Sequence, residues 1–165
     1  MKLRALILAV FMLALSGCGF HLRGQAGMPF KSIYLDAPNL NTPFINELRR
    51  NLIANKLQLA SSAAQAEVIL HIVSEQTDKQ ILTLGGTGRV SEFKLRMLVS
   101  LRADDNAQHD WIRAEELSIE RDYSYDDTKI LAKEAEEALL YTSMRTDMVQ
   151  QIVRRLSHAK MQIEP

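Results

Sequence analysis

The chain has 165 residues, 47% of them hydrophobic, with 20 basic and 20 acidic residues. This length suits one domain with a real core, and this hydrophobic content excludes a wholly disordered chain. Because the charges balance, the composition does not indicate binding to nucleic acid or to a broad anionic surface, and any anion site must be local.

The first 17 residues predict a bacterial lipoprotein signal peptide, which is removed from the mature chain. Lys2 and Arg4 form its basic start, and the apolar run 5–15 is its core, being too short for a helix that spans a bilayer. The segment Leu15-Ser16-Gly17-Cys18 has the spacing of a lipobox. Its cysteine is the only one in the chain, so an intrachain disulfide is excluded.

We expect Cys18 to become the first mature residue and to carry an N-acyl chain and a diacylglycerol lipid, because one fatty chain holds a protein only marginally. The next residue is Gly19, whereas an acidic residue there is the usual inner-membrane retention signal of Gram-negative lipoproteins. The outer membrane is therefore predicted, with a tether over 18–30 and a single α/β domain over 31–165.

A first strand is predicted over 31–36, which is rich in apolar, β-branched and aromatic residues. Thr42 is then a helix N-cap, with Pro43 at the first helical position where its missing N–H costs nothing. This helix should end between residues 56 and 59. Its apolar stripe consists of Phe44, Ile45, Leu48, Leu52, Ile53 and Leu57.

A second strand is predicted over 66–74, where valine, isoleucine and leucine dominate. It contains His71, and a lone histidine in such a strand is more often packed than a ligand. Three glycines within 83–88 turn the chain before the next element.

The clearest periodicity is the alternation over 92–103, which predicts a long strand with one covered face. Turn residues at 104–106 then predict a hairpin whose return strand spans 111–125. The covered face consists of Phe93, Leu95, Met97, Val99, Leu101 and Ala103. The opposite face carries Lys94, Arg96 and Arg102 and is open to water or to a polar partner.

A final helix begins at a cap formed by Asp126, Asp127 or Thr128 and runs to about His158, without glycine or proline. Such a helix is about 45 Å long and crosses the whole sheet. Its predicted apolar side consists of Ile130, Leu131, Ala135, Ala138, Leu139, Thr142, Val149, Ile152 and Leu156.

The element order β-α-β-β-β-α predicts an α+β fold, a two-layer sandwich in which two helices pack on one face of a four-stranded mixed sheet. The last three strands should be antiparallel, and the first should join them through a βαβ crossover.

Patterns typical of catalytic and metal sites do not occur in the sequence. The four histidines lie in different predicted elements, and no pair has the spacing of a helical zinc site. The glycine-rich segment 83–88 lacks the lysine of a P-loop, and the acidic run 134–137 suits a solvated helix face. We therefore expect no enzyme, no metal and no cofactor apart from the lipid on Cys18.

With these elements in place, the chain resembles the LptE family, the lipopolysaccharide-assembly lipoproteins of Gram-negative outer membranes. The motifs that carry the resemblance are Cys18-Gly19-Phe20-His21-Leu22-Arg23, Val90-Ser91-Glu92-Phe93, Leu131-Ala132-Lys133 and Arg154-Arg155-Leu156.

The resemblance implies a protein that sits as a plug inside the lumen of the β-barrel LptD, as a 1:1 heterodimer. It also implies help in barrel assembly, binding of lipopolysaccharide on its way to the cell surface, and a lipid-anchored position facing the periplasm. No nucleic acid is implied. The polar face of the long strand then meets either the lumen wall or water, and the sequence favours neither.

For the lipopolysaccharide site, the resemblance carries a basic residue onto Lys133. The family's second basic position matches Gly86, so Arg89 either substitutes for it or that half of the site is missing. Arg121 is a third candidate. The alternative for Lys133 is an ordinary surface lysine paired with Glu136 or a neighbouring glutamate.

Two other functions stay open at this point. The chain fits a free-standing periplasmic lipoprotein that binds a peptide or small ligand, or acts as an envelope enzyme, which would require a concave pocket with converging titratable groups. It also fits a subunit of another envelope transporter, which would co-purify with inner-membrane components.

Overall fold

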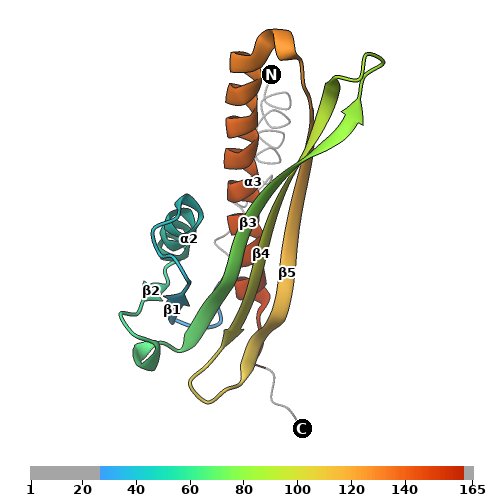
Figure 1. Cartoon of the computed structure of the whole chain (residues 1–165). Helices are drawn as coiled ribbons and strands as arrows, with labels where there is room; N and C mark the ends of the chain where they lie inside the picture. Colours follow the sequence, from blue (N-terminus) through green and yellow to red (C-terminus); the bar gives the residue numbers. More distant parts are fainter. Residues whose placement is uncertain (1–26, 162–165) are drawn as a thin grey trace, which may run out of the picture.

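The structure, a computed structural model, describes residues 27–161 (Figure 1). The predicted signal peptide, Cys18 and most of the predicted tether lie outside the described residues. The elements are β1 (Ser32–Asp36), α2 (Pro43–Ala54), β2 (Gln58–Leu59), β3 (Val68–Leu84), β4 (Val90–Asp104), β5 (Asp110–Ser124) and α3 (Ile130–His158), with short 3₁₀ turns η1 (Ala63–Gln65) and η2 (Asp127–Lys129).

The sheet has five strands in the order β2-β1-β3-β4-β5. β1 is parallel to β2 and β3, while β4 is antiparallel to both β3 and β5, so the predicted mixed sheet and crossover are confirmed. The predicted count of four strands is wrong. The extra strand, β2, has only two residues, which is too short to show any periodicity.

Both helices cover the same face of the sheet, and the core lies between these two layers (Figure 1). Five of the six residues predicted for the covered face of β4 are buried and the sixth, Phe93, packs against them. α3 runs along the whole sheet, but α2 lies beside the lower half only.

α2 begins as predicted. The Oγ1 atom of Thr42 accepts a hydrogen bond from the backbone N–H of Ile45 at 3.1 Å and donates one to Glu75 of β3 at 2.7 Å. The N-cap therefore also ties the helix to the sheet. Ile53, which was predicted to lie on the apolar stripe, is 55% exposed, because it points away from both the sheet and α3.

β3 continues to Leu84, ten residues beyond the predicted end of the strand at Ser74. Its second half is largely exposed, and pairing with β4 rather than burial holds it extended. β1 pairs with β3 only as far as His71, so β3 becomes an edge strand beyond this point.

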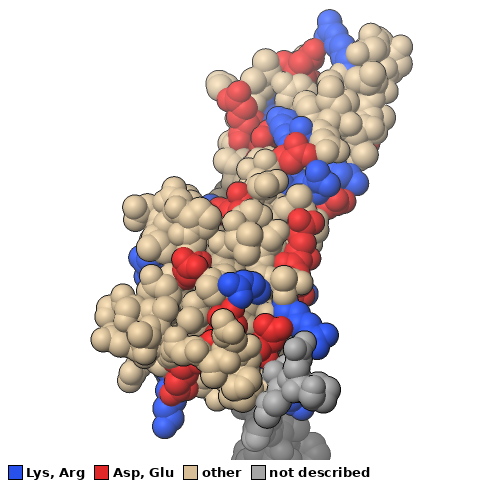
Figure 2. Space-filling view, turned by 60° about the horizontal axis from the view of Figure 1, so that its bottom comes forward, with Lys and Arg blue, Asp and Glu red and all other residues tan. Residues whose placement is uncertain are grey.

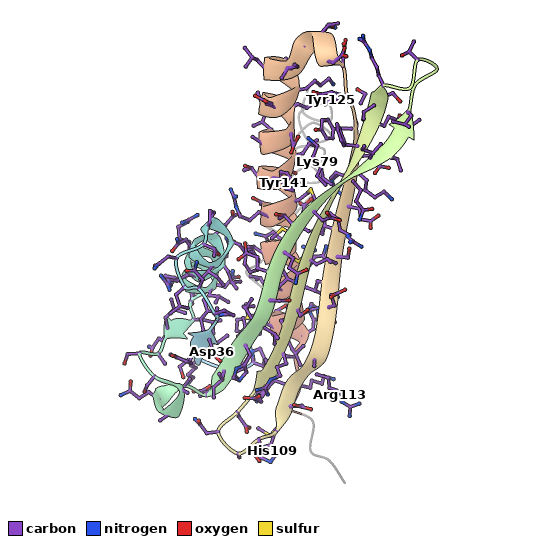
Figure 3. All side chains as sticks on the ribbon, viewed as in Figure 1. Asp36, Lys79, His109, Arg113, Tyr125 and Tyr141 are labelled. Carbon is purple, nitrogen blue, oxygen red and sulfur yellow. The ribbon has the colours of Figure 1, made fainter. Side chains whose placement is uncertain are left out.

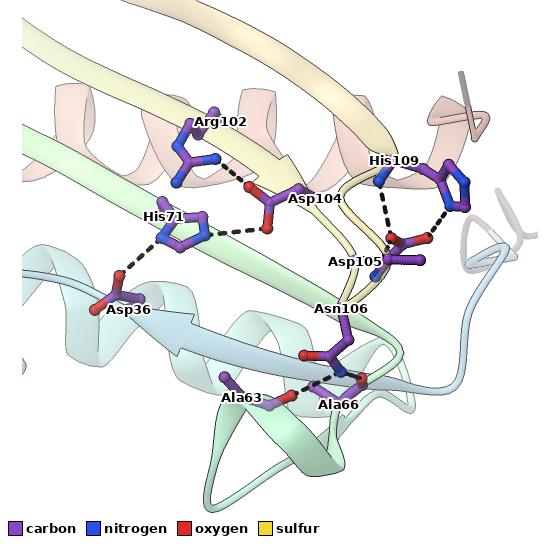
Figure 4. Close-up of polar contacts among 10 residues, drawn as sticks. Asp36, Ala63, Ala66, His71, Arg102, Asp104, Asp105, Asn106 and His109 are labelled. Atoms are coloured by element: carbon purple, nitrogen blue, oxygen red, sulfur yellow. Dashed lines mark hydrogen bonds and ion pairs between the residues drawn. The ribbon is translucent and has the colours of Figure 1, made fainter. Parts of the chain in front are cut away.

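His71 joins three strands on the face away from the helices (Figure 4). Its Nδ1 atom lies 2.7 Å from Asp36 of β1, and its Nε2 atom lies 3.2 Å from Asp104 of β4. Arg102 contacts the same Asp104 carboxylate. This histidine holds strands together, in agreement with the prediction of a packed residue.

α3 is buried only in its second half, where its buried residues begin at Met144. Leu131 and Leu139, which were predicted to lie on the buried side, are 83% and 71% exposed. This part of the prediction is wrong because α2 has only 12 residues and lies beside the second half of α3, so it does not cover that face. Among residues 27–161, no helix has the length and apolar character needed to cross a membrane.

Candidate functional site

The upper end of the molecule, called the tip below, comprises the β3–β4 turn (85–89), the β5–α3 connection (124–129) and the first turn of α3. In the turn, the backbone N–H of Gly85 donates to the carbonyl of Arg89 at 2.7 Å, and Gly88 has a φ of 77°. Side-chain-bearing residues rarely adopt this conformation, so glycine at position 88 makes the tight turn possible. The turn places Arg89 at the start of β4.

The β5–α3 connection is held against this hairpin. The N–H of Tyr125 donates to the carbonyl of Ser91 at 2.8 Å. Asp126 then accepts hydrogen bonds from the hydroxyl and the N–H of Thr128, which lower the pKa of the Asp126 carboxyl and start η2. α3 therefore begins one 3₁₀ turn after the predicted cap.

Two of the three candidate cations converge on this connection. Arg89 forms an ion pair with Asp127 at 2.9 Å. Lys133 donates to the hydroxyl of Ser124 at 3.2 Å and to Glu136 at 2.8 Å. The pair with Glu136 matches the surface-lysine alternative, although the Lys133 side chain is only 15% exposed.

Arg121 lies apart from the tip. It pairs with Asp147 at 2.7 Å, in the middle of α3. Asp147 follows Lys133 by 14 residues in the helix, a separation of about 21 Å.

The ends of the elements that form or adjoin the tip carry exposed apolar side chains. They are Ile81, Leu82 and Leu84 at the end of β3 and Ile130 and Leu131 at the start of α3. This feature was not predicted from the sequence. Ile130 and Leu131 were expected on the buried side of the helix, and the apolar run before the glycines was given no role. Cations and exposed apolar groups together make the tip amphipathic.

Below the tip, a polar cluster replaces the apolar core between α3 and the sheet. Lys79 of β3 contacts Glu137 of α3 at 2.5 Å, and Tyr123 of β5 donates its hydroxyl to the same carboxylate. The Lys79 ammonium also lies 4.2 Å from the ring centroid of Phe93. Figure 3 shows Lys79 and Tyr141 in the space between α3 and the upper sheet.

Burial and mutual hydrogen bonds shift the pKa values of this cluster in opposite directions. Burial alone would raise the pKa of Glu137, but the bonds from Lys79 and Tyr123 outweigh it and lower that pKa. Burial would lower the pKa of Lys79, but the bonds to Glu137 and Tyr123 raise it. The ion pair is therefore favoured over a neutral pair.

The three cations predicted for the outer face of the sheet are all paired with carboxylates. Lys94 pairs with Glu120 at 3.2 Å, Arg96 pairs with Asp78 at 3.3 Å, and Arg102 contacts Asp104. Figure 2 shows acidic and basic side chains interspersed over the visible surface. Within residues 27–161, no cluster of three or more histidine, cysteine, aspartate or glutamate side chains has a geometry able to hold a metal ion.

Comparison with known proteins decides the family. The LptE family model, described as lipopolysaccharide-assembly, matches residues 30–156. The chain belongs to the LptE family. The resemblance drawn from the sequence motifs is thereby confirmed.

Relatives in this family include the LPS-assembly lipoprotein LptE of Pectobacterium atrosepticum, which is 25% identical over 94% of this chain and 85% of its own length. The LPS-assembly lipoprotein LptE of Yersinia pestis (strain Pestoides F) is 26% identical over 94% of this chain and 75% of its own length.

Solved structures agree with the LptE fold described above. Lipoprotein B of Nitrosomonas europaea is 35% identical and covers 84% of this chain and 90% of its own, with a TM-score of 0.73. Rare lipoprotein B of Shewanella oneidensis is 22% identical and covers 77% and 94%, with a TM-score of 0.69, which supports the fold alone.

Proposed function

We propose that this LptE-family lipoprotein is the plug and assembly partner of the LptD β-barrel, and that its tip binds lipopolysaccharide. One observation carries the binding proposal: Arg89 and Lys133 converge on a single connection beside exposed apolar side chains. Arg89 then takes the place of the basic residue that the family pattern puts at Gly86. Arg121 of β5 does not join this site, because its partner Asp147 lies about 21 Å from Lys133 along α3.

The chemistry of the tip suits a phosphorylated lipid. Lysine and arginine donate charge-assisted hydrogen bonds to phosphate oxygens, and the exposed leucines and isoleucines offer contacts for acyl chains. The present partners, Asp127 and Glu136, are 45% and 47% exposed. Such surface pairs contribute about 0–1 kcal/mol, so a phosphate displaces these carboxylates at little cost.

The plug proposal is supported by the surface of the sheet. A barrel lumen is polar, and the outer sheet face presents paired charges rather than an apolar patch. A protein with this surface stays stable inside such a lumen while its lipid on Cys18 holds it in the outer membrane.

The binding proposal is tested by comparing lipopolysaccharide affinity of the mature lipoprotein with that of Lys133→Glu and Arg89→Glu. We expect each reversal to weaken binding about tenfold or more, since it replaces a phosphate contact by repulsion. Lys56→Glu is the matched control, because this exposed lysine follows α2 and is remote from the tip. Equal affinity of Lys133→Glu and Lys56→Glu, with both folded, would exclude the tip site.

The plug proposal is tested by purifying the tagged mature protein from outer membranes in mild detergent. A stoichiometric barrel of large mass is expected to accompany it. Recovery of the protein alone, under conditions that keep other outer-membrane complexes intact, would instead favour a free-standing lipoprotein. Inner-membrane components in the eluate would indicate another envelope transporter.

A further inference from the structure

The end of the molecule opposite the tip carries a groove that the proposed function does not use. It lies between the start of β5 and the end of α3 and has a volume of about 540 Å³. Its polar and aromatic lining consists of Trp111, Arg113, Glu115, Arg155, His158 and Lys160.

Two cations in this groove have no carboxylate partner. Arg155 is neutralised by Glu115 at 2.7 Å, but among residues 27–161 neither Arg113 nor Lys160 contacts an acidic side chain. In Figure 3, Arg113 extends away from the lower end of β5. Within residues 27–161, the groove therefore offers a ligand two positive charges that no carboxylate pairs.

His158 adds a directed nitrogen to these charges. Its Nδ1 atom lies 2.8 Å from the backbone carbonyl of Arg154, which fixes the ring at the end of α3. Within the described part of the chain, its Nε2 atom has no partner and is left for a ligand.

Trp111 forms an aromatic wall of the groove. It packs edge-to-face on Phe30, with 5.4 Å between ring centroids. Its indole nitrogen is enclosed and finds no acceptor in the described residues, so the wall holds an unsatisfied donor. Tryptophan beside cations is typical of protein surfaces at the headgroup level of a bilayer.

The position of Phe30 places the groove near the membrane anchor. Cys18, the expected lipidation site, precedes Phe30 by 12 residues, a tether of about 40 Å at most. The tip, in contrast, lies at the far end of α3, about 44 Å away along the helix. The tether therefore joins the domain at the end that carries the groove, not at the tip.

We propose that this groove binds the headgroup of an anionic glycerophospholipid from the leaflet that holds the anchor. Arg113 and Lys160 contact the phosphodiester oxygens, and the Nε2 atom of His158 faces the glycerol region. The site rests on lipidation at Cys18, but it does not depend on lipopolysaccharide binding at the tip. It holds the end of the molecule that carries the tether at the surface of that leaflet, and the rest of the protein stays available to the barrel.

Trp111 provides a direct readout, because it is the only tryptophan in the chain. The mature lipidated protein is held in neutral detergent micelles, and phosphatidylglycerol is added while Trp111 emission is recorded. We expect a saturable change with phosphatidylglycerol, and none with phosphatidylcholine or inorganic phosphate. An equal response to phosphatidylcholine would overturn the proposal, and a response to inorganic phosphate alone would reassign the groove to a free anion.

Matched variants locate the response. The double variant Arg113→Gln, Lys160→Gln should weaken phosphatidylglycerol binding about tenfold, because it removes two contacts between cations and the anionic headgroup. Arg49→Gln with Arg50→Gln removes the same charge from α2 and should change it less than about twofold. Equal effects of the two pairs would overturn the proposal.

Lipopolysaccharide binding separates this site from the tip. The groove variant should retain lipopolysaccharide affinity, and Lys133→Glu should retain the phosphatidylglycerol response. Loss of both ligands in the groove variant would show a single shared surface and overturn a separate site. If lipopolysaccharide does not bind at the tip, the phosphatidylglycerol titration still tests the groove.

Discussion

The lower and upper halves of this molecule share one sheet and one helix but are stabilised differently. In the lower half, α2 and the second half of α3 pack on the sheet around fully buried residues such as Leu48 and Met148. In the upper half, α3 meets the sheet through the Lys79–Glu137 pair and aromatic rings. In this half, the side of α3 that carries Leu139 is exposed to solvent.

This difference follows from the length of α2. Glu47, near the start of α2, accepts hydrogen bonds from Arg145 at 2.9 Å and Thr146 at 2.7 Å. Further along α2, Asn51 accepts one from Gln150 at 3.0 Å, so this short helix lies beside the second half of α3. Burial of apolar area is the main source of stability, so the upper half should open more easily than the lower half. The half with less burial is also the half that carries the proposed lipopolysaccharide site.

The largest effect is expected in the lower half. Leu48→Ala removes a fully buried side chain between α2 and the sheet and should lower the free energy of unfolding by about 2–5 kcal/mol. Urea denaturation measures this loss. A change below about 1 kcal/mol would mean that α2 is not part of the cooperative core.

A smaller effect is expected in the upper half. Lys79→Met leaves Glu137 without its cation and should cost about 1 kcal/mol, a value discounted because Lys79 is partly exposed. In hydrogen exchange, the amides in the first half of α3 should lose protection, whereas the protection of the Leu48 amide should not change. Lys94→Met, which breaks a pair on the outer face, is the control and should change exchange little.

The same pair predicts a dependence on pH. The pKa of Glu137 is lowered in the folded protein from its ordinary value of 4.5, so its contribution is present above 4.5 and is lost as the pH falls through the folded value. The pKa of Lys79 is raised above 10.5, so its contribution persists to that pH and is lost above it. Unfolding measured between neutral and acid pH should show a steeper loss for the native chain than for Lys79→Met.

The smallest effect is expected for Leu139→Ala, the same truncation as Leu48→Ala on the bare side of α3. An exposed leucine buries little area, so unfolding should change by less than about 0.5 kcal/mol. Thermal unfolding of the two leucine variants side by side measures the contrast between the halves. A cost as large as that of Leu48→Ala would show that this face is covered.

Much of the fold could be read from local patterns. The Thr42–Pro43 start of α2 and the alternation along β4 depend on neighbours within a few residues, and both are confirmed. β2 and the second half of β3 could not be read, because pairing with distant strands holds these segments extended. For the candidate site, the family resemblance predicted Lys133 and Arg89. The exposed apolar side chains at the end of β3 and the start of α3 were not predicted.

The sequence by itself determined the lipoprotein pattern at Cys18, the order of the main helices and strands, and membership of the LptE family. Only the tertiary structure decided which apolar residues of α3 are buried, because burial depends on which part of α3 lies beside α2. It also decided that Arg89 and Lys133 both contact the β5–α3 connection, through Asp127 and Ser124, while Arg121 does not. Two cations 44 positions apart reach the same connection only because the β3–β4 turn and the start of α3 fold to the same end of the molecule.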